Sequence, residues 1–328
     1  MIGIGMGTNY VPGRTGQLPP AGAVAYYDFI SGDKSGLSST FTRASAAWRY
    51  DETGALVSTA TDVLRVDYDG TTLAKRGVLL EVASTNGVRN STGAGASAGV
   101  LPTYWTMTAS SAGITSSVVG AGAEDGIAYV DLRFVGTAAG AAGFFINPDT
   151  TTQIVAATGE THVASWHHRL MAGVLTGVTV QISCAGYTAA GAGTEQGLAT
   201  IVPTTAALKT QRASVAKTFA VGTTARMLPF AYVSALNGTI MDLTLRFALP
   251  QGEKRAVVST VIPTTSAAIT RAADVLTLTP FADGALTWRA LYDGGTTGTI
   301  ATGITGAYAV DPAALTLARV KTIWAATS

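Results

Sequence analysis

The sequence predicts an all-β protein made of sandwich modules, and three observations support this prediction. From Ala23 onward, short runs rich in Val, Ile, Thr, Tyr, Phe and Trp are separated by Gly, Asp, Asn and Ser, at roughly the 8–12-residue spacing typical of a sandwich or barrel. Apolar and polar residues alternate within several runs, as in half-buried strands. Charged residues make up only 12% of the chain, with Thr, Ser, Ala and 38 Gly in their place, which excludes a coiled coil and a charge-rich disordered chain.

Residues 1–22 are expected to form an extended arm, because Gly and Pro punctuate the segment throughout. Two interpretations fit such an end: a frayed tail, or a peg that becomes ordered when it docks onto a partner. As a peg, the arm would use the residues between its glycines for anchoring to a particle, namely Asn9, Tyr10, Val11, Pro12 and Arg14.

Strands are predicted in order along the rest of the chain. Their faces can be assigned where the alternation is clear. In 127–135, Ala128, Val130, Leu132 and Phe134 share one face, which we expect to be the core. Thr239–Phe247 places Met241, Leu243, Leu245 and Phe247 on one face in the same way. The other expected strands are 24–30, 39–42, 76–82, 103–109, 143–146, 162–170, 178–184, 213–220, 227–233, 275–278, 286–292 and 315–324.

The segment 315–324 has two interpretations. Asp311 and Pro312 are suited to the N-cap and first position of a helix running to Trp324. The run that begins at Leu315 also alternates as a strand does, and we predict a strand.

Four segments are predicted. They are the arm 1–22, a β-rich N-terminal module 23–92, a sandwich 100–262 and a C-terminal β segment 263–328, with the Gly, Ala and Ser stretch 91–99 as the linker.

Charge and composition exclude several kinds of partner. The formal net charge is +1, which argues against a protein that neutralises nucleic-acid phosphates. Apolar stretches are interrupted by Arg, Asp or Pro, so we expect no membrane helix, and the N-terminus lacks the pattern of a signal peptide. Cys184 is the only cysteine, lies in an apolar run and is expected to be unreactive.

No catalytic or metal-binding motif is found, so we predict neither enzyme activity nor a cofactor or metal. His162, His167 and His168 lie on one expected strand, at spacings that keep them from sharing an ion. Asp67 and Asp69 precede a glycine as calcium ligands do, but the further ligands of such a loop are missing, which favours a structural turn. Glu124 and Asp125 lie in a Gly-rich turn, and a non-local carboxylate pair remains the alternative.

The aromatic residues are the candidates for ligand binding, because sugar rings stack on aromatic faces while their hydroxyls bond Asn, Asp and Arg. Trp105 and Trp166 lie within alternating strands and are expected in the core. The aromatics of the C-terminal segment flank a turn and are expected to be exposed. The predicted carbohydrate-binding set is therefore Trp288, Arg289, Tyr292, Asp293 and Tyr308.

Several phrases resemble a module of tailed-phage and gene transfer agent fibre or spike proteins. They are Tyr27-Asp28-Phe29-Ile30-Ser31-Gly32, Phe41-Thr42-Arg43-Ala44-Ser45, Val66-Asp67-Tyr68-Asp69, Arg76-Gly77-Val78-Leu79-Leu80-Glu81 and Thr85-Asn86. The central region, which ends in the phrase Ile262–Asp274, is similar to the carbohydrate-binding-like jelly roll that often follows this module. One residue departs from the pattern, since Ser84 replaces the Arg that usually precedes the Thr-Asn pair.

The resemblance implies all-β jelly-roll, lectin-like modules with an extended N-terminal arm. It implies a non-catalytic virion head spike or fibre subunit on the outside of a particle, attached through its N-terminal region to a capsid, spike-base or tail protein and binding host capsular or surface polysaccharide. The low charge and the Ala- and Thr-rich strands predict a homo-oligomer, and the fibre resemblance implies a trimer. The alternatives are a purely structural decoration or connector protein and a capsule depolymerase.

Overall fold

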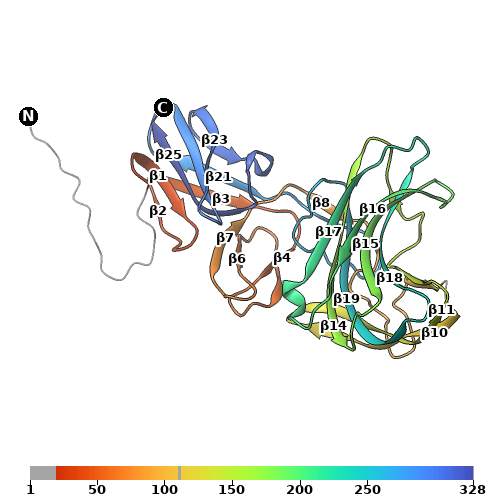
Figure 1. Ribbon diagram of the computed structural model, residues 1–328. Helices are drawn as coiled ribbons and strands as arrows, with labels where there is room; N and C mark the ends of the chain where they lie inside the picture. Colours follow the sequence, from red (N-terminus) through yellow and green to blue (C-terminus); the bar gives the residue numbers. More distant parts are fainter. Residues whose placement is uncertain (1–19, 110–111, 328) are drawn as a thin grey trace, which may run out of the picture. The chain divides into compact units, whose positions relative to one another are not determined.

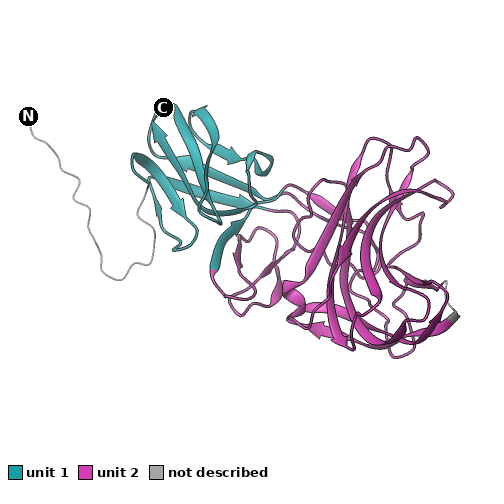
Figure 2. Ribbon diagram, in the orientation of Figure 1, with its two compact units in different colours: residues 1–42, 75–81, 274–328 teal, residues 43–74, 82–273 magenta. Residues whose placement is uncertain are grey.

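The computed structural model describes residues 20–109 and 112–327, so the predicted anchoring residues Asn9 to Arg14 lie outside the described part. The chain forms two compact units (Figure 2). Unit 1 consists of the described residues up to Thr42 together with Lys75–Glu81 and Asp274 onward. Unit 2 consists of Arg43–Ala74 and Val82–Ala273. Unit 1 is therefore assembled from segments near both ends of the sequence.

Two small antiparallel sheets make up unit 1 (Figure 1). The larger has the order β2-β1-β25-β22-β23, with β7 paired to β25, and the smaller has the order β24-β21-β3. The strands are β1 (Ala23–Asp28), β2 (Lys34–Ser35), β3 (Leu37–Thr42), β7 (Lys75–Leu79), β21 (Val275–Pro280), β22 (Leu286–Tyr292), β23 (Thr297–Ile304), β24 (Tyr308–Val310) and β25 (Arg319–Thr327).

Gly77 is required where β7 meets β25. Its φ is +106°, and a Cβ at this position would stand 2.1 Å from the carbonyl oxygen of Val320. Both facts exclude a side chain here. The contact gives a physical reason for the glycine in the phrase Arg76-Gly77.

Unit 2 is a sandwich of two antiparallel sheets. The first sheet has the order β10-β11-β19-β14-β17 and the second has the order β16-β15-β18-β12-β9, with β13 also paired to β18. The first-sheet strands are β10 (Ala112–Glu124), β11 (Ile127–Ala139), β14 (Thr161–Ala172), β17 (Arg212–Thr218) and β19 (Ile240–Glu253). The second-sheet strands are β9 (Thr106–Ala109), β12 (Ala142–Asn147), β13 (Ile154–Val155), β15 (Val178–Tyr187), β16 (Gly193–Ile201) and β18 (Arg226–Ala235).

Smaller elements complete unit 2. β4 (Ala47–Tyr50) pairs with β5 (Leu56–Thr59), and β8 (Ser84–Asn86) pairs with β20 (Ile269–Arg271). β6 spans Arg65–Tyr68, and a short 3₁₀ turn, η1, spans Leu208–Thr210.

Large aromatic side chains fill the space between the two sheets of unit 2. Trp166 contacts Trp105 edge-on, with ring centroids 5.5 Å apart, and contacts Phe247 at 5.8 Å. Trp105 donates from its indole nitrogen to the carbonyl of Asn90 at 2.7 Å, so its polar atom is satisfied in the core. The prediction that both tryptophans belong to the core is confirmed.

The fold class is confirmed: the described residues form β-sandwich architecture and contain no α-helix. The predicted core faces are confirmed as well, since Val130, Leu132 and Phe134 on β11 and Leu243 on β19 are buried. At the last strand, the predicted strand is confirmed from Arg319 onward, and the alternative of a helix running to Trp324 is wrong. Asp311 caps a 3₁₀ turn, η2 (Pro312–Ala314), and the chain then enters β25.

The two units do not follow the predicted segments along the chain. The predicted module 23–92 contributes to both units, and the predicted segment 263–328 joins unit 1 from Asp274 onward. The expected linker 91–99 lies within unit 2, where the Thr92 amide donates to the carbonyl of Thr264 at 3.0 Å.

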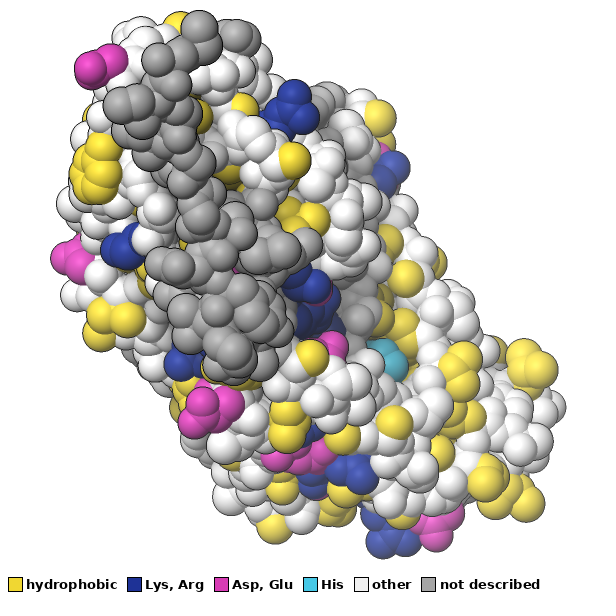
Figure 3. Space-filling model, turned by 90° about the vertical axis from the view of Figure 1, so that its left-hand side faces the viewer, with side chains coloured by type: hydrophobic (Ala, Val, Ile, Leu, Met, Phe, Trp, Pro, Cys, Tyr) yellow, Lys and Arg dark blue, Asp and Glu magenta, His cyan; other side chains and the backbone are white. Residues whose placement is uncertain are grey.

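Surface charge is sparse and mixed. On the face that Figure 3 shows, Lys and Arg side chains are interspersed with Asp and Glu side chains among apolar and neutral ones. In the described part of the chain, no helix has the length and apolar character needed to cross a membrane.

Candidate functional site

The predicted aromatic set in unit 1 is mostly buried, and the prediction that these rings are exposed is wrong. Trp288 is 0% exposed, Tyr292 1% and Tyr308 8%. The rings of Trp288 and Tyr308 stack on each other with centroids 5.4 Å apart. Residues two apart on β22 all point inward, namely Leu286, Trp288, Ala290 and Tyr292, so the alternation itself was a signal for a core face.

The polar members of that set, Asp293 and Arg289, do not form an accessible site with the aromatic residues either. Asp293 pairs with Arg76 at 2.5 Å and with Lys321 at 3.2 Å. Burial works to raise the pKa of Asp293, but these two cations outweigh it and hold the pKa below its ordinary value. Arg289 is exposed on β22. The structure therefore does not gather these residues into one accessible site.

The three histidines of β14 are buried: His162 and His167 are 1% exposed and His168 is 7% exposed. Burial lowers the pKa of all three, that of His168 to about 4. Only His162 has a side-chain partner, Glu160 at 3.1 Å. Among the described residues, no group of three or more His, Cys, Asp or Glu side chains is arranged to hold a metal ion.

The two aspartates with calcium-like spacing bond the backbone. Asp67 is 1% exposed and accepts from the amide of Tyr50 at 3.0 Å. Asp69 accepts from the amides of Thr71 and Thr72 at 3.0 and 2.8 Å. Asp69 therefore shapes the turn, as predicted, while Asp67 links β6 to β4.

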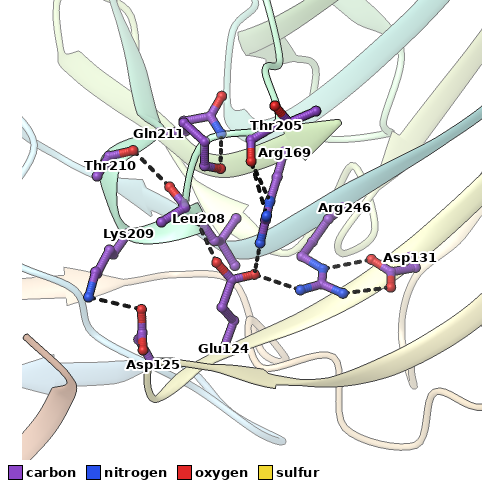
Figure 4. Close-up of polar contacts among 12 residues, drawn as sticks. Glu124, Asp125, Asp131, Arg169, Thr205, Leu208, Lys209, Thr210, Gln211 and Arg246 are labelled. Carbon is purple, nitrogen blue, oxygen red and sulfur yellow. Dashed lines mark hydrogen bonds and ion pairs between the residues drawn. The ribbon is translucent and has the colours of Figure 1, made fainter. Parts of the chain in front are cut away.

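A charged cluster lies on the outer face of the first sheet (Figure 4). Arg246 donates to Asp131 through two nitrogens, at 2.8 and 2.9 Å, and to Glu124 at 2.7 Å. Glu124 also accepts from Arg169 and from the amide of Leu208, both at 2.8 Å. The Arg246 guanidinium additionally lies 3.2 Å from the centroid of the Tyr129 ring.

This cluster stabilises the sandwich and is poorly suited to acid catalysis. Burial works to raise the pKa of Glu124, but the hydrogen bonds from Leu208 and Arg169 outweigh it and leave the pKa below its ordinary value. A glycosidase acid needs the opposite shift, so that it holds a proton to donate. The contacts of Arg169 with Glu124 and with the carbonyl of Thr205 instead tie the loop before β17 to the sheet.

A different surface, the outer face of the second sheet, combines aromatic rings with uncharged hydrogen-bonding side chains. We call it the aromatic face. The core side of this sheet holds Phe144, Ile182 and Val233, and the side chains in between point outward because neighbours in a strand alternate. One register row crosses the five strands β9, β12, β18, β15 and β16. Its members are, in that order, Thr108, Phe145, Tyr232, Gln181 and Thr200.

Aromatic rings form the centre of this face. Phe145 is 36% exposed, and its ring lies 4.5 Å from that of Tyr232 and 5.4 Å from that of Phe230. Phe230 and Leu228 form a small apolar cluster on this side of the sheet, separate from the main core, with Tyr187 and Tyr232 packed against it. The face thus offers half-exposed rings on a fixed apolar base.

Uncharged hydrogen-bonding groups flank the rings. The Gln181 amide donates to Thr200 at 3.3 Å, and Ser183 lies beside Gln196, with 3.5 Å between hydroxyl and amide oxygens. Amides and hydroxyls both donate and accept, as the hydroxyls of a sugar do. A pocket of about 380 Å³ opens at one end of the face, lined by Tyr187, Glu195, Gln196 and neighbouring residues of β15 and β16.

Tyr187 and Glu195 are the two titratable residues that line this pocket. Burial raises the pKa of Tyr187, so its hydroxyl stays protonated. Burial also works to raise the pKa of Glu195, but hydrogen bonds from the Val221 amide and the Lys217 ammonium outweigh it and leave the pKa low. Glu195 is thus a carboxylate already bound within the protein.

Comparisons with known proteins place the fold in context. The sequence matches no protein-family profile and no curated protein. Among solved structures, a carbohydrate-binding module of the β-sandwich superfamily is 13% identical over 70% of this chain and 84% of its own, with a TM-score of 0.37.

Two further structures match at lower scores. The family 11 carbohydrate-binding module of a cellulosomal cellulase from Clostridium thermocellum is 11% identical over 49% of this chain and 92% of that module, with a TM-score of 0.29. The glycoside hydrolase domain of Endo-D from Streptococcus pneumoniae is 10% identical over 70% of this chain and 38% of that one, with a TM-score of 0.29.

Proposed function

We propose that unit 2 binds a polysaccharide without cleaving it, and that the ligand lies on the aromatic face. The observation that supports this function best is the register row with Phe145 and Tyr232 at its centre and Thr108, Gln181 and Thr200 around them. Rings that are half-exposed can stack on the apolar faces of sugar rings, and the amide and hydroxyl groups beside them can bond the sugar hydroxyls.

A single shallow site of this kind binds weakly, on the order of millimolar, which is about −4 kcal/mol. Several copies joined in one particle raise the avidity by about 10²–10⁴ without a new contact. We therefore propose that the chain acts as a homo-oligomer, most simply a trimer. Light scattering on the purified protein tests this, because a stable 33.3 kDa monomer at micromolar concentration would contradict it.

We further propose a biological setting for this binding. The sequence resemblance supports a virion head spike or fibre subunit that binds host surface polysaccharide, attaches to the particle through residues 1–22 and lies on its exterior. Gold-labelled antibody against the chain should decorate the outside of particles, and deletion of residues 1–22 should abolish incorporation of an otherwise soluble protein. Normal incorporation of the truncated chain would contradict the anchoring role.

The sugar-binding proposal is tested by truncating Phe145. Phe145→Ala should weaken binding to a retained polysaccharide about tenfold, which corresponds to about 1.4 kcal/mol, because the central stacking ring is lost. Affinity electrophoresis of the full chain against a panel of bacterial capsular polysaccharides measures the change. Val135→Ala is the matched control, since Val135 is 38% exposed against 36% for Phe145 and lies on the first sheet.

Equal binding by both variants would refute the aromatic face as the site. If none of the polysaccharides retains the protein but the antibody decorates particles, a structural connector is favoured. A fall in polymer viscosity during incubation would instead identify a depolymerase.

A further inference from the structure

Arg226 lies at the walled end of the aromatic face. It is the first residue of β18, and in the sheet register it stands opposite Tyr187 of β15 on one side and Val155 of β13 on the other. Residues two apart on β18 share a face, so Arg226 lies on the same side as Leu228, Phe230 and Tyr232. It is the one charged residue among the outward-facing positions of this strand.

The guanidinium of Arg226 is nearly without partners. One nitrogen, Nη1, lies 3.5 Å from the carbonyl oxygen of Ala225, and Nε is buried with no hydrogen-bond acceptor. Arg226 forms no ion pair with any residue in the described ranges. Four other arginines of unit 2 each hold a carboxylate, namely Arg89, Arg133, Arg169 and Arg246.

Loops that meet beside Arg226 close this end of the face. A Cβ on Gly191, in the turn between β15 and β16, would stand only 2.6 Å from the hydroxyl oxygen of Thr151, in the loop before β13. Leu228, the next outward residue of β18, is fully buried. Arg226 is half-buried beside this wall and its Nε is buried, which strengthens an interaction with an anion there relative to one in bulk water.

Nearby carboxylates are already occupied. Asp149 is bound by Arg89 through both of its oxygens, and Glu195 is bound by Lys217 at 3.0 Å. An arginine has five N–H donors, and a buried donor left without an acceptor is unfavourable. Nε of Arg226 has no acceptor among the described residues, and an oxyanion that accepts two parallel N–H bonds matches a guanidinium best.

We infer that the ligand of the aromatic face is an acidic polysaccharide, and that Arg226 determines this specificity by binding an oxyanion substituent of one sugar unit at the walled end. The inference rests on the proposed function, because the uncharged rings and amides would hold the sugar backbone. The oxyanion is a carboxylate or a sulfate, which share the required chemistry, and one polymer of each kind distinguishes the two sources.

The test compares charged polymers with their neutral counterparts on the full chain. Affinity electrophoresis is run in polygalacturonate, carboxyl-reduced polygalacturonate, dextran sulfate and dextran. The native protein should bind at least one acidic polymer about tenfold more tightly than its neutral counterpart. Arg226→Gln should remove that preference and leave binding to the neutral polymer unchanged. Arg133→Gln is the matched control, because it removes the same charge from the outer face of the first sheet.

Each result decides the matter. Three results would overturn the inference. The native protein could bind charged and neutral polymers equally, it could bind neither acidic polymer, or its preference could survive in Arg226→Gln. Loss of the preference in Arg133→Gln as well would show general attraction of a polyanion and would also overturn it. Failure of the proposed function is recognised separately, because Phe145→Ala would then leave binding to every polymer unchanged.

Discussion

Replacing His168 with Gln should reduce the loss of unfolding free energy of unit 2 as the pH falls below about 6.5. His168 is 7% exposed on β14, and burial lowers its pKa to about 4, against about 6.5 in an unfolded chain. The unfolded state therefore takes up the proton first, and stability is lost as the pH falls from about 6.5 toward about 4. At pH 5 this one side chain accounts for a loss of about 2 kcal/mol, and below pH 4 for about 3 kcal/mol.

The measurement is the difference in unfolding free energy between pH 7.5 and pH 5, in urea, for the native chain and for His168→Gln. Hydrogen exchange of peptides from β14 and β19 reports on unit 2 separately from unit 1. The native chain should lose about 2 kcal/mol more than the variant over this range. Carboxylates with lowered pKa, such as Glu124 and Glu195, act below this window, because even in an unfolded chain a Glu carboxylate has a pKa of only about 4.3. Parallel profiles for the two proteins would refute the reasoning.

Three further predictions follow from single contacts. Gly77→Ala should destabilise unit 1 by about 1–3 kcal/mol more than Gly284→Ala in urea unfolding, because both glycines have positive φ but only Gly77 meets a backbone oxygen. Arg246→Met should lower the stability of unit 2 by about 2 kcal/mol in urea unfolding, since it removes the ion pair of the partly buried Asp131 and one of the two arginines that hold Glu124. Burial raises the pKa of Cys184 to about 12, so a maleimide should modify it only after denaturant is added, as followed by mass spectrometry.

The sequence was sufficient where a single strand carries its own pattern. On β11 and β19 the alternation identifies the buried face directly, because the side-chain period in a strand is two. The same rule applied to Trp288 and Tyr292 would have placed them in the core. Their position beside a Gly-rich turn favoured exposure, but both rings are buried, and that of Trp288 stacks on Tyr308.

The aromatic face required information that no single strand contains. Phe145 and Tyr232 are 87 positions apart in the sequence and become neighbours only through the register of β12 and β18. β18 is apolar on both faces, with Leu228 and Phe230 on one and Ala231 and Val233 on the other. That pattern hides which side carries the proposed ligand surface, so the candidate site could be recognised only from the assembled sheet.

The way unit 1 is assembled has a consequence for how the protein is made. Asp28 on β1 pairs with Thr322 on β25, roughly 290 residues further along the chain. At a synthesis rate of about 5–20 residues per second, β1 leaves the ribosome about 15–60 s before its partner strand exists. All segments of unit 2 emerge in that interval, so unit 2 is able to fold while unit 1 still exposes an unpaired strand edge, which is prone to aggregation. Any shortening of the chain that removes β25 would leave the strands of unit 2 complete and unit 1 permanently open.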